Sequence, residues 1–166
     1  MPNLIDGESM FGCDTMLKSF KGGLKALTNG FEMFYDCTAL SVFSEDLTTL
    51  TNGAAMFRNC TSLYELNFDL QSMVDGSNMF NVNMQSHTSF KGNLSSLIQG
   101  HSMFKNRLRS FDGSLSSLEI GKDMFRGCCL DKKSIKKIAS SIKQLPINPS
   151  WTYPAEYYTA QNYTGD

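Results

Sequence analysis

The stretch GFEMFYDCTALSVFSEDLTTLTN, residues 30–52, decides the fold of this chain. The next 23 residues, GAAMFRNCTSLYELNFDLQSMVD (53–75), repeat its pattern of glycine, Met-Phe, cysteine and leucine. Met-Phe pairs occur six times, and the steps between their methionines are 23, 23, 23, 24 and 21 residues. A fixed period of this length predicts a repeat protein whose units bury their apolar side chains against one another. A glycine precedes each methionine by three positions: Gly7, Gly30, Gly53, Gly76, Gly100 and Gly121.

The apolar residues of each unit recur every three or four positions, a spacing that an amphipathic helix also shows. Each unit nevertheless contains glycine and several Ser, Thr or Asn residues, and 23 residues are too few for two helices with their turns. We therefore expect a chain that bends repeatedly and points one side chain inward at each corner. We expect the glycines to allow a positive φ angle or a close approach between windings.

The segments MFYDCTAL (33–40) and MFRNCTSL (56–63) resemble the 23-residue motif of BspA-like leucine-rich repeats, with methionine in place of that family's alanine. The resemblance covers residues 4–130. It implies an α/β solenoid with a parallel strand ladder on one face, around the Leu-x-x-Phe segments, and short helical turns on the other. Similar units occur in surface proteins of host-associated bacteria and in phage proteins, which implies a cell surface or a virion. The fourth and fifth units depart from the motif by lacking its cysteine.

Three regions follow from this interpretation. Residues 1–130 form a solenoid of about five and a half coils. Residues 131–146 form a capping helix, because Asp131 is a good N-cap and Pro146 ends the helical pattern. The apolar face of this helix holds Ile135, Ile138, Ile142 and Leu145. Its lysines form either a solvated outer face or a site for an anionic partner.

Residues 147–166 form the third region, an extended tail that is rich in aromatic residues. Tyrosine and tryptophan give a large contact area at a low cost in entropy. The tail either packs on its own solenoid or docks on a partner in an assembly. In the second case the contact residues are Trp151, Tyr153, Tyr157 and Tyr158. The first unit has no comparable lid, so we also expect possible self-association through an open N-terminal coil.

The charge of the chain excludes some partners. Fifteen basic and sixteen acidic residues give a net charge of −1, which argues against bulk attraction to nucleic acid or to an anionic membrane. The charges are segregated along the chain: residues 1–75 hold four basic and ten acidic side chains, and residues 76–143 hold eleven basic and four acidic ones. Such polarity either orients a partner or reflects drift between repeats. We see neither a secretory signal nor a run of apolar residues long enough to span a membrane.

The sequence offers little for catalysis or for cofactors. Its two histidines, His87 and His101, have no nucleophile or metal cluster beside them, and the five cysteines have no zinc spacing. Glu45, Asp46, Glu65 and Asp69 are expected to approach one another on adjacent coils. Carboxylates this common are usually solvated, so we expect no enzyme, no metal site and no cofactor.

The sequence thus predicts a non-enzymatic interaction or adhesion module that binds a protein or a glycan on its repeat surface. The expected binding residues flank the predicted strands: Lys21, Tyr64, Glu65, Lys91 and Arg109. The alternative is a structural component of a phage virion or of a surface appendage. In that case the open N-terminal coil and the aromatic tail would do the docking.

Overall fold

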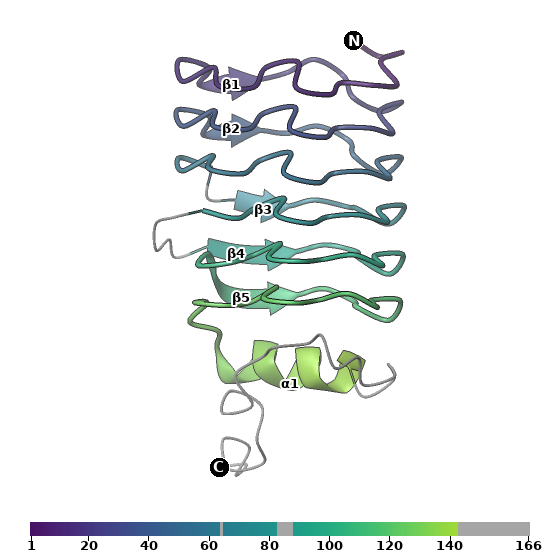
Figure 1. Cartoon of the computed structure of the whole chain (residues 1–166), viewed down its shortest axis with the longest axis vertical. Coiled ribbons are helices and arrows are strands. Elements are labelled where there is room, and N and C mark those ends of the chain that lie inside the picture. The colour runs from purple at the N-terminus through teal and green to yellow at the C-terminus, as the bar shows by residue number, and fades with distance from the viewer. Residues whose placement is uncertain (64, 83–87, 143–166) are drawn as a thin grey trace.

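The computed structural model describes residues 1–63, 65–82 and 88–142. The chain winds repeatedly, and the windings stack in a single file from the N-terminus to a helix at the other end (Figure 1). The strands are β1 (Ser19–Phe20), β2 (Val42–Phe43), β3 (Glu65–Asn67), β4 (Thr88–Lys91) and β5 (Leu108–Asp112), and the helix is α1 (Lys132–Ile142). Strands β1, β2 and β5 lie at Leu-x-x-Phe segments, whereas β3 has leucine, Leu66, in place of the phenylalanine, and β4 has Phe90 without the leucine three residues before it. The assignment of this stack to the leucine-rich-repeat solenoids stays a prediction.

All strand pairs are parallel and join neighbouring windings. β1 pairs with β2, and β3, β4 and β5 form a second sheet in that order. The register places Phe20 beside Phe43, and Phe90 beside Phe111. The residue just before each repeated glycine forms a single parallel bridge to its counterpart in the next winding. These bridges join Asp6 to Asn29, Asn29 to Asn52, Asn52 to Asp75, Asp75 to Gln99, and Gln99 to Ile120. The bridges are continuous, whereas the strand ladder is interrupted between β2 and β3.

The Met-Phe segments form consecutive hydrogen-bonded turns that contain no helix, which corrects the expectation of short helical turns. Within one turn the N–H of Met33 bonds to the carbonyl of Gly30 at 3.1 Å, and the N–H of Phe34 bonds to Met56 of the next winding at 2.9 Å. Residues before methionine and three after it adopt a positive φ, a conformation that interrupts a right-handed helix. They are Ser9, Glu32, Ala55, Asn78, Ser102 and Asp123, and Cys13, Asp36, Asn59, Asn106 and Gly127.

The repeated glycines do not adopt a positive φ. They lie instead where neighbouring windings approach closely, which is the second of the two roles that we expected for them. A Cβ atom added to Gly7 would lie 2.8 Å from Sδ of Met33, and one on Gly30 would lie 3.0 Å from Sδ of Met56. The glycine of each winding therefore leaves room for the methionine of the next one.

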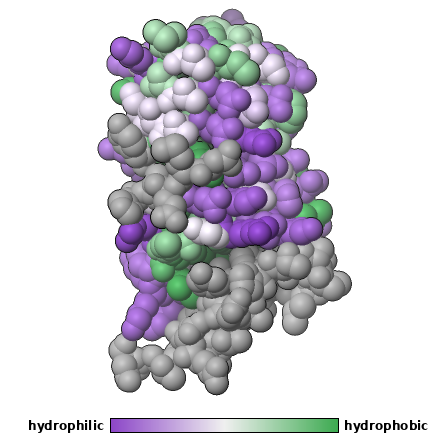
Figure 2. Space-filling model, turned by 60° about the vertical axis from the view of Figure 1, so that its left-hand side comes forward, coloured by the Kyte–Doolittle hydropathy of each residue, from purple (hydrophilic) through white to green (hydrophobic). Residues whose placement is uncertain are grey.

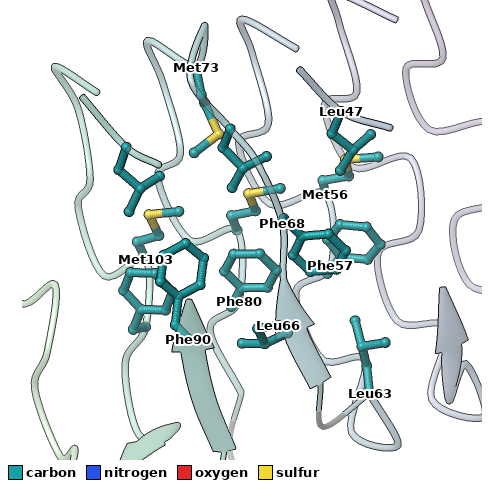
Figure 3. Packing of buried hydrophobic residues seen from close by; sticks show 14 of the residues in the cluster. Leu47, Met56, Phe57, Leu63, Leu66, Phe68, Met73, Phe80, Phe90 and Met103 are labelled. Carbon is teal, nitrogen blue, oxygen red and sulfur yellow. The ribbon is translucent and has the colours of Figure 1, made fainter. Parts of the chain in front are cut away.

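Two columns of phenylalanine rings form the core. The Met-Phe rings of Phe34, Phe57 and Phe80 are stacked, with centroids 5.5 and 5.7 Å apart and interplanar angles of 3° and 2°. Rings from the strand side pack against this column, as Phe43 does 4.8 Å from Phe57 at 77°. The repeated Met, Cys and Leu positions of the inner windings are also buried, many with no exposed surface at all. Figure 3 shows this packing from close by.

Helix α1 lies across the last winding. Asp131 accepts a hydrogen bond of 2.8 Å from the N–H of Ser134, as an N-cap does. Ile138 is fully buried, Ile135 is half-buried, and Lys137 pairs with Asp112 of β5. The expected helix extends to residue 146. Its last four residues, which include Leu145, lie outside the described part of the chain, and so does the side chain of Ile142.

Candidate functional site at the strand face

The strand face consists of the outward-pointing side chains of β1 to β5 and of the residue that follows each strand. Because side chains alternate along a strand, every second residue here is exposed, as the burial of β3 shows: Glu65 exposed, Leu66 buried, Asn67 exposed. Parallel register then places exposed residues of neighbouring windings in rows. One such row holds Asn67, Lys91 and Asp112.

The structure places four of the five predicted binding residues on this face. Lys21 follows β1, Glu65 begins β3, Lys91 ends β4, and Arg109 lies in β5; all four side chains are exposed. Arg109 is the extra residue of a β-bulge, because Thr88 pairs with Leu108 while Ser89 pairs with Ser110. The four residues do not form one cluster, because each lies on a different winding. Tyr64 and the predicted assembly residues Trp151, Tyr153, Tyr157 and Tyr158 lie outside the described residues.

A pocket of about 630 Å³ opens on the strand face between β2 and β3, where the ladder is interrupted. We call it the slot. In Figure 1, β3 lies below the level of the turn that precedes it, farther from β2 than from β4. The slot is lined by Ser41, Val42, Phe43, Ser44, Glu45, Asp46, Leu63, Glu65, Asn67 and Phe68.

The interruption follows from an exchange of residues in the third winding. Leu66 stands where the other strands carry phenylalanine, and Phe68 stands where the first, fourth and fifth units carry glycine. The ring of Phe68 enters the core, 5.7 Å from Phe57 and 5.8 Å from Phe80, and stacks on both (Figure 3). A strand that places its phenylalanine ring two residues later follows a different path, and β3 therefore does not pair with β2.

Glu45 holds the upper side of the slot in place. Its carboxylate accepts three backbone hydrogen bonds from the first winding, from Gly22 at 2.9 Å, Gly23 at 2.8 Å and Leu24 at 3.2 Å. Gly23 has a φ of +70°, which helps to turn successive N–H groups toward one anion. The main contacts of this carboxylate are therefore structural.

The other two carboxylates of the slot face solvent. Asp46 accepts hydrogen bonds from the hydroxyl and the N–H of Thr48, at 2.6 and 2.9 Å, and these bonds lower the pKa of Asp46. Glu65 is exposed on β3. Three of the four carboxylates that we expected to approach one another, Glu45, Asp46 and Glu65, thus line a single pocket, and no described lysine or arginine lines it with them.

The basic residues concentrate beyond β3. Lys91 is adjacent to Asp112, whose pKa is lowered mainly by its hydrogen bond from Lys137 and also by the charge of Lys91. One basic residue is buried instead: Arg107 occupies the cysteine position of the fifth unit and is only 2% exposed. Its guanidinium donates to the carbonyl of Cys60 at 3.3 Å, and burial lowers its pKa to about 10.

The described residues contain no group of three His, Cys, Asp or Glu side chains that could hold a metal ion. Cys37 and Cys60 are buried and donate their thiols to the carbonyls of Phe11 and Phe34, at 3.0 and 3.1 Å. Burial raises the pKa of Cys60 to about 12, which keeps the thiol protonated. Within the described ranges, no helix is long and apolar enough to cross a membrane.

The sequence analysis named Glu45, Asp46 and Glu65, which line the slot, but it did not predict the slot or its other polar residues, Ser41, Ser44 and Asn67. The sequence did contain an indication of the slot: in the third unit, Leu66 replaces the repeated phenylalanine, and a phenylalanine stands two residues later at position 68. No family model, curated protein or solved structure matches this chain.

Proposed function

We propose that this protein is a non-enzymatic interaction module that binds a protein or glycan ligand on its strand face. The observation that carries the proposal is the slot between β2 and β3, which opens among exposed polar side chains of the strand face. Its volume of about 630 Å³ is in the range of ligand pockets, roughly 300–1,000 Å³. The resemblance to BspA-like repeats supports the same proposal, because that family includes surface proteins.

The chemistry of the slot favours recognition over catalysis. Glu45 is already bonded to three backbone N–H groups, and Asp46 has a lowered pKa that suits a permanently ionised group. A general acid or base that works near neutral pH needs the opposite shift in a carboxylate. Fixed carboxylates, hydroxyls and an amide are instead the groups that orient a bound ligand.

The test of this proposal is charge reversal on the strand face. The full chain is screened against a glycan array and a random-peptide library, and each hit is measured again with Lys21→Glu, Glu65→Lys and the double variant Lys91→Glu/Arg109→Glu. We expect at least one variant to weaken a hit about tenfold with unchanged thermal unfolding. Hits that bind all folded variants equally well would exclude the strand face.

A structural role in a larger assembly is the second candidate, and one observation favours it. The first winding exposes large apolar side chains, with Ile5 63% and Met16 77% exposed, and hydrophobic residues gather at that end of the stack in Figure 2. Met10 of the first winding is 45% exposed, whereas its counterparts Met33 and Met56 in the inner windings are fully buried. Light scattering on the full chain and on a chain without residues 147–166 tests this role. An assembly that forms through the tail dissociates after the deletion, whereas one that forms through the first winding persists.

A further inference from the structure

The slot leaves backbone hydrogen-bonding groups of β2 without a strand beside them. The N–H of Val42 points to the first winding, where it bonds to the carbonyl of Lys18 at 3.3 Å. Because successive residues of a strand direct their peptide groups to opposite edges, the N–H and C=O of Phe43 face the slot. Among the described residues, no backbone hydrogen bond joins β2 to β3. A strand edge that has no partner among the described residues is a template for another strand.

The side chains of the slot divide into an apolar floor and an acidic rim. Phe43, Leu63 and Phe68 are at most 9% exposed and form the floor. Val42 and Ser44 above, and Glu65 and Asn67 below, are exposed toward solvent. Asp46 and Glu65 give the rim a negative charge that no described basic residue of the lining balances.

We infer that the slot takes an extended peptide segment of a partner protein, in which basic and apolar residues alternate, as an added strand between β2 and β3. This inference rests on the proposed function and names the ligand class. An extended segment directs alternate side chains to opposite sides, so its apolar residues meet the floor while its lysines or arginines meet Asp46 and Glu65. Residues 41–46 line one side of the slot, and a peptide of six residues in extended conformation would span about 20 Å at 3.3 Å per residue.

The chain's own tail does not have this chemistry. Residues 147–166 contain two acidic residues and no basic one, so they do not complement the rim. The same holds for the tail of a second copy. The charge of the slot therefore favours a partner protein over self-occupation.

Fluorescence anisotropy with the full chain tests the inference. The probe is a labelled octapeptide of alternating lysine and valine; the comparators are alternating glutamate and valine, four lysines followed by four valines, and the alternating lysine peptide N-methylated at every second amide. We expect binding of the alternating lysine peptide only, and binding about tenfold weaker for Asp46→Lys/Glu65→Lys. The matched control is Glu8→Lys, an exposed charge on the first turn, for which we expect less than about a twofold change.

Amide hydrogen exchange locates the peptide independently of its charge. We expect exchange at Phe43 to slow about tenfold in the complex, while Val42, already bonded to Lys18, changes little. Equal binding of the glutamate peptide, unchanged affinity in the double variant, or protection confined to residues away from the slot overturns the inference. Slow exchange at Phe43 in the free chain that becomes fast after deletion of residues 147–166 assigns the slot to the tail and also overturns it.

The two proposals fail separately. If the alternating lysine peptide does not bind, but a hit from the array or library is weakened by Lys91→Glu/Arg109→Glu, the inference is wrong and the proposed function stands. If no probe of either kind depends on the strand face, both are wrong.

Discussion

The hydroxyl oxygen of Ser134 accepts a hydrogen bond of 2.7 Å from the backbone N–H of Phe111. Both residues are buried, and the bond joins α1 to the outer edge of β5. In this way the helix supplies an acceptor where the stack offers no further winding. A capped edge of this kind is what prevents a repeat array from adding another chain at that end.

Replacing Ser134 by alanine leaves the buried N–H of Phe111 without its acceptor. We expect the free energy of unfolding to fall by about 1–3 kcal/mol, measured by urea denaturation. Ser140→Ala is the control, since its hydroxyl bonds the carbonyl of Lys137 in an exposed position and its loss should cost less than about 0.5 kcal/mol. Equal effects of the two substitutions would contradict this role of Ser134.

Asp131 stabilises the start of α1, and its contribution depends on pH. Hydrogen bonds from Ser134 lower the pKa of Asp131 in the folded chain. The folded chain therefore binds fewer protons than the unfolded chain near the ordinary carboxyl pKa of about 3.9, and the stabilisation is lost as the pH falls through and below this value. We expect Asp131→Ala to cost about 1 kcal/mol at pH 7 and less at pH 3, from urea curves at both pH values. A cost that does not depend on pH would be evidence against the cap.

The ring of Phe68 replaces the strand phenylalanine that the third winding lacks. Because this ring is 4% exposed and stacked on two others, we expect Phe68→Gly to lower stability by at least about 3 kcal/mol. Adding Leu66→Phe restores the arrangement of the other windings and should recover a large part of that loss. The double variant should also lose the slot, so its affinity for slot ligands should drop while its melting temperature recovers. No recovery would show that the interruption has another cause.

Two glycines test how tightly the windings approach. A Cβ on Gly92 would lie 1.9 Å from the backbone carbonyl oxygen of Phe68, which cannot move away alone. A Cβ on Gly53 would lie 3.0 Å from the flexible side chain of Met73. Overpacking that side chains can absorb costs about 1–3 kcal/mol, so we expect Gly53→Ala to fall in that range and Gly92→Ala to exceed it. Thermal unfolding of both variants ranks them, and the reverse order would contradict the packing.

The thiols divide into accessible and protected groups. Cys13 and Cys129 are exposed, whereas Cys37, Cys60 and Cys128 are buried. We expect iodoacetamide at pH 8 to alkylate the first two in the folded chain and the other three only after unfolding, with mass spectrometry as the measurement. The pKa of Cys60 is about 12 when folded, so the folded chain holds this proton longer and stability declines as the pH rises above about 9. Rapid alkylation of Cys60 at pH 8 would contradict its burial.

The repeat pattern carries most of the information about the core. Residues such as Met33, Phe34 and Cys37 are buried where the 23-residue period places apolar side chains. The period also places the strands, because the Leu-x-x-Phe segments of neighbouring windings must lie side by side once the windings stack. The hydrophobic pattern and its period were therefore enough to predict the core positions and the approximate places of the strands.

The conformation of the turns could not be read from the same pattern. Positive φ occurs at Glu32, Ala55 and Asn78, residues with no common chemistry, because the hydrogen bonds between neighbouring windings impose it. The slot could not be predicted from the sequence for a different reason. The third unit keeps the 23-residue length, so the alignment hides the movement of a ring from position 66 to position 68.

The stacked turns run without a break, while the opposite side is split between β2 and β3. A stack whose windings are hydrogen-bonded along one side and interrupted on the other is expected to bend toward or away from the interrupted side. We call the interruption the notch. Bending in that plane would widen or narrow the notch and would act on the contact between the rings of Phe43 and Phe68, whose centroids lie 5.7 Å apart. We therefore expect any bending of the stack to occur at the level between β2 and β3.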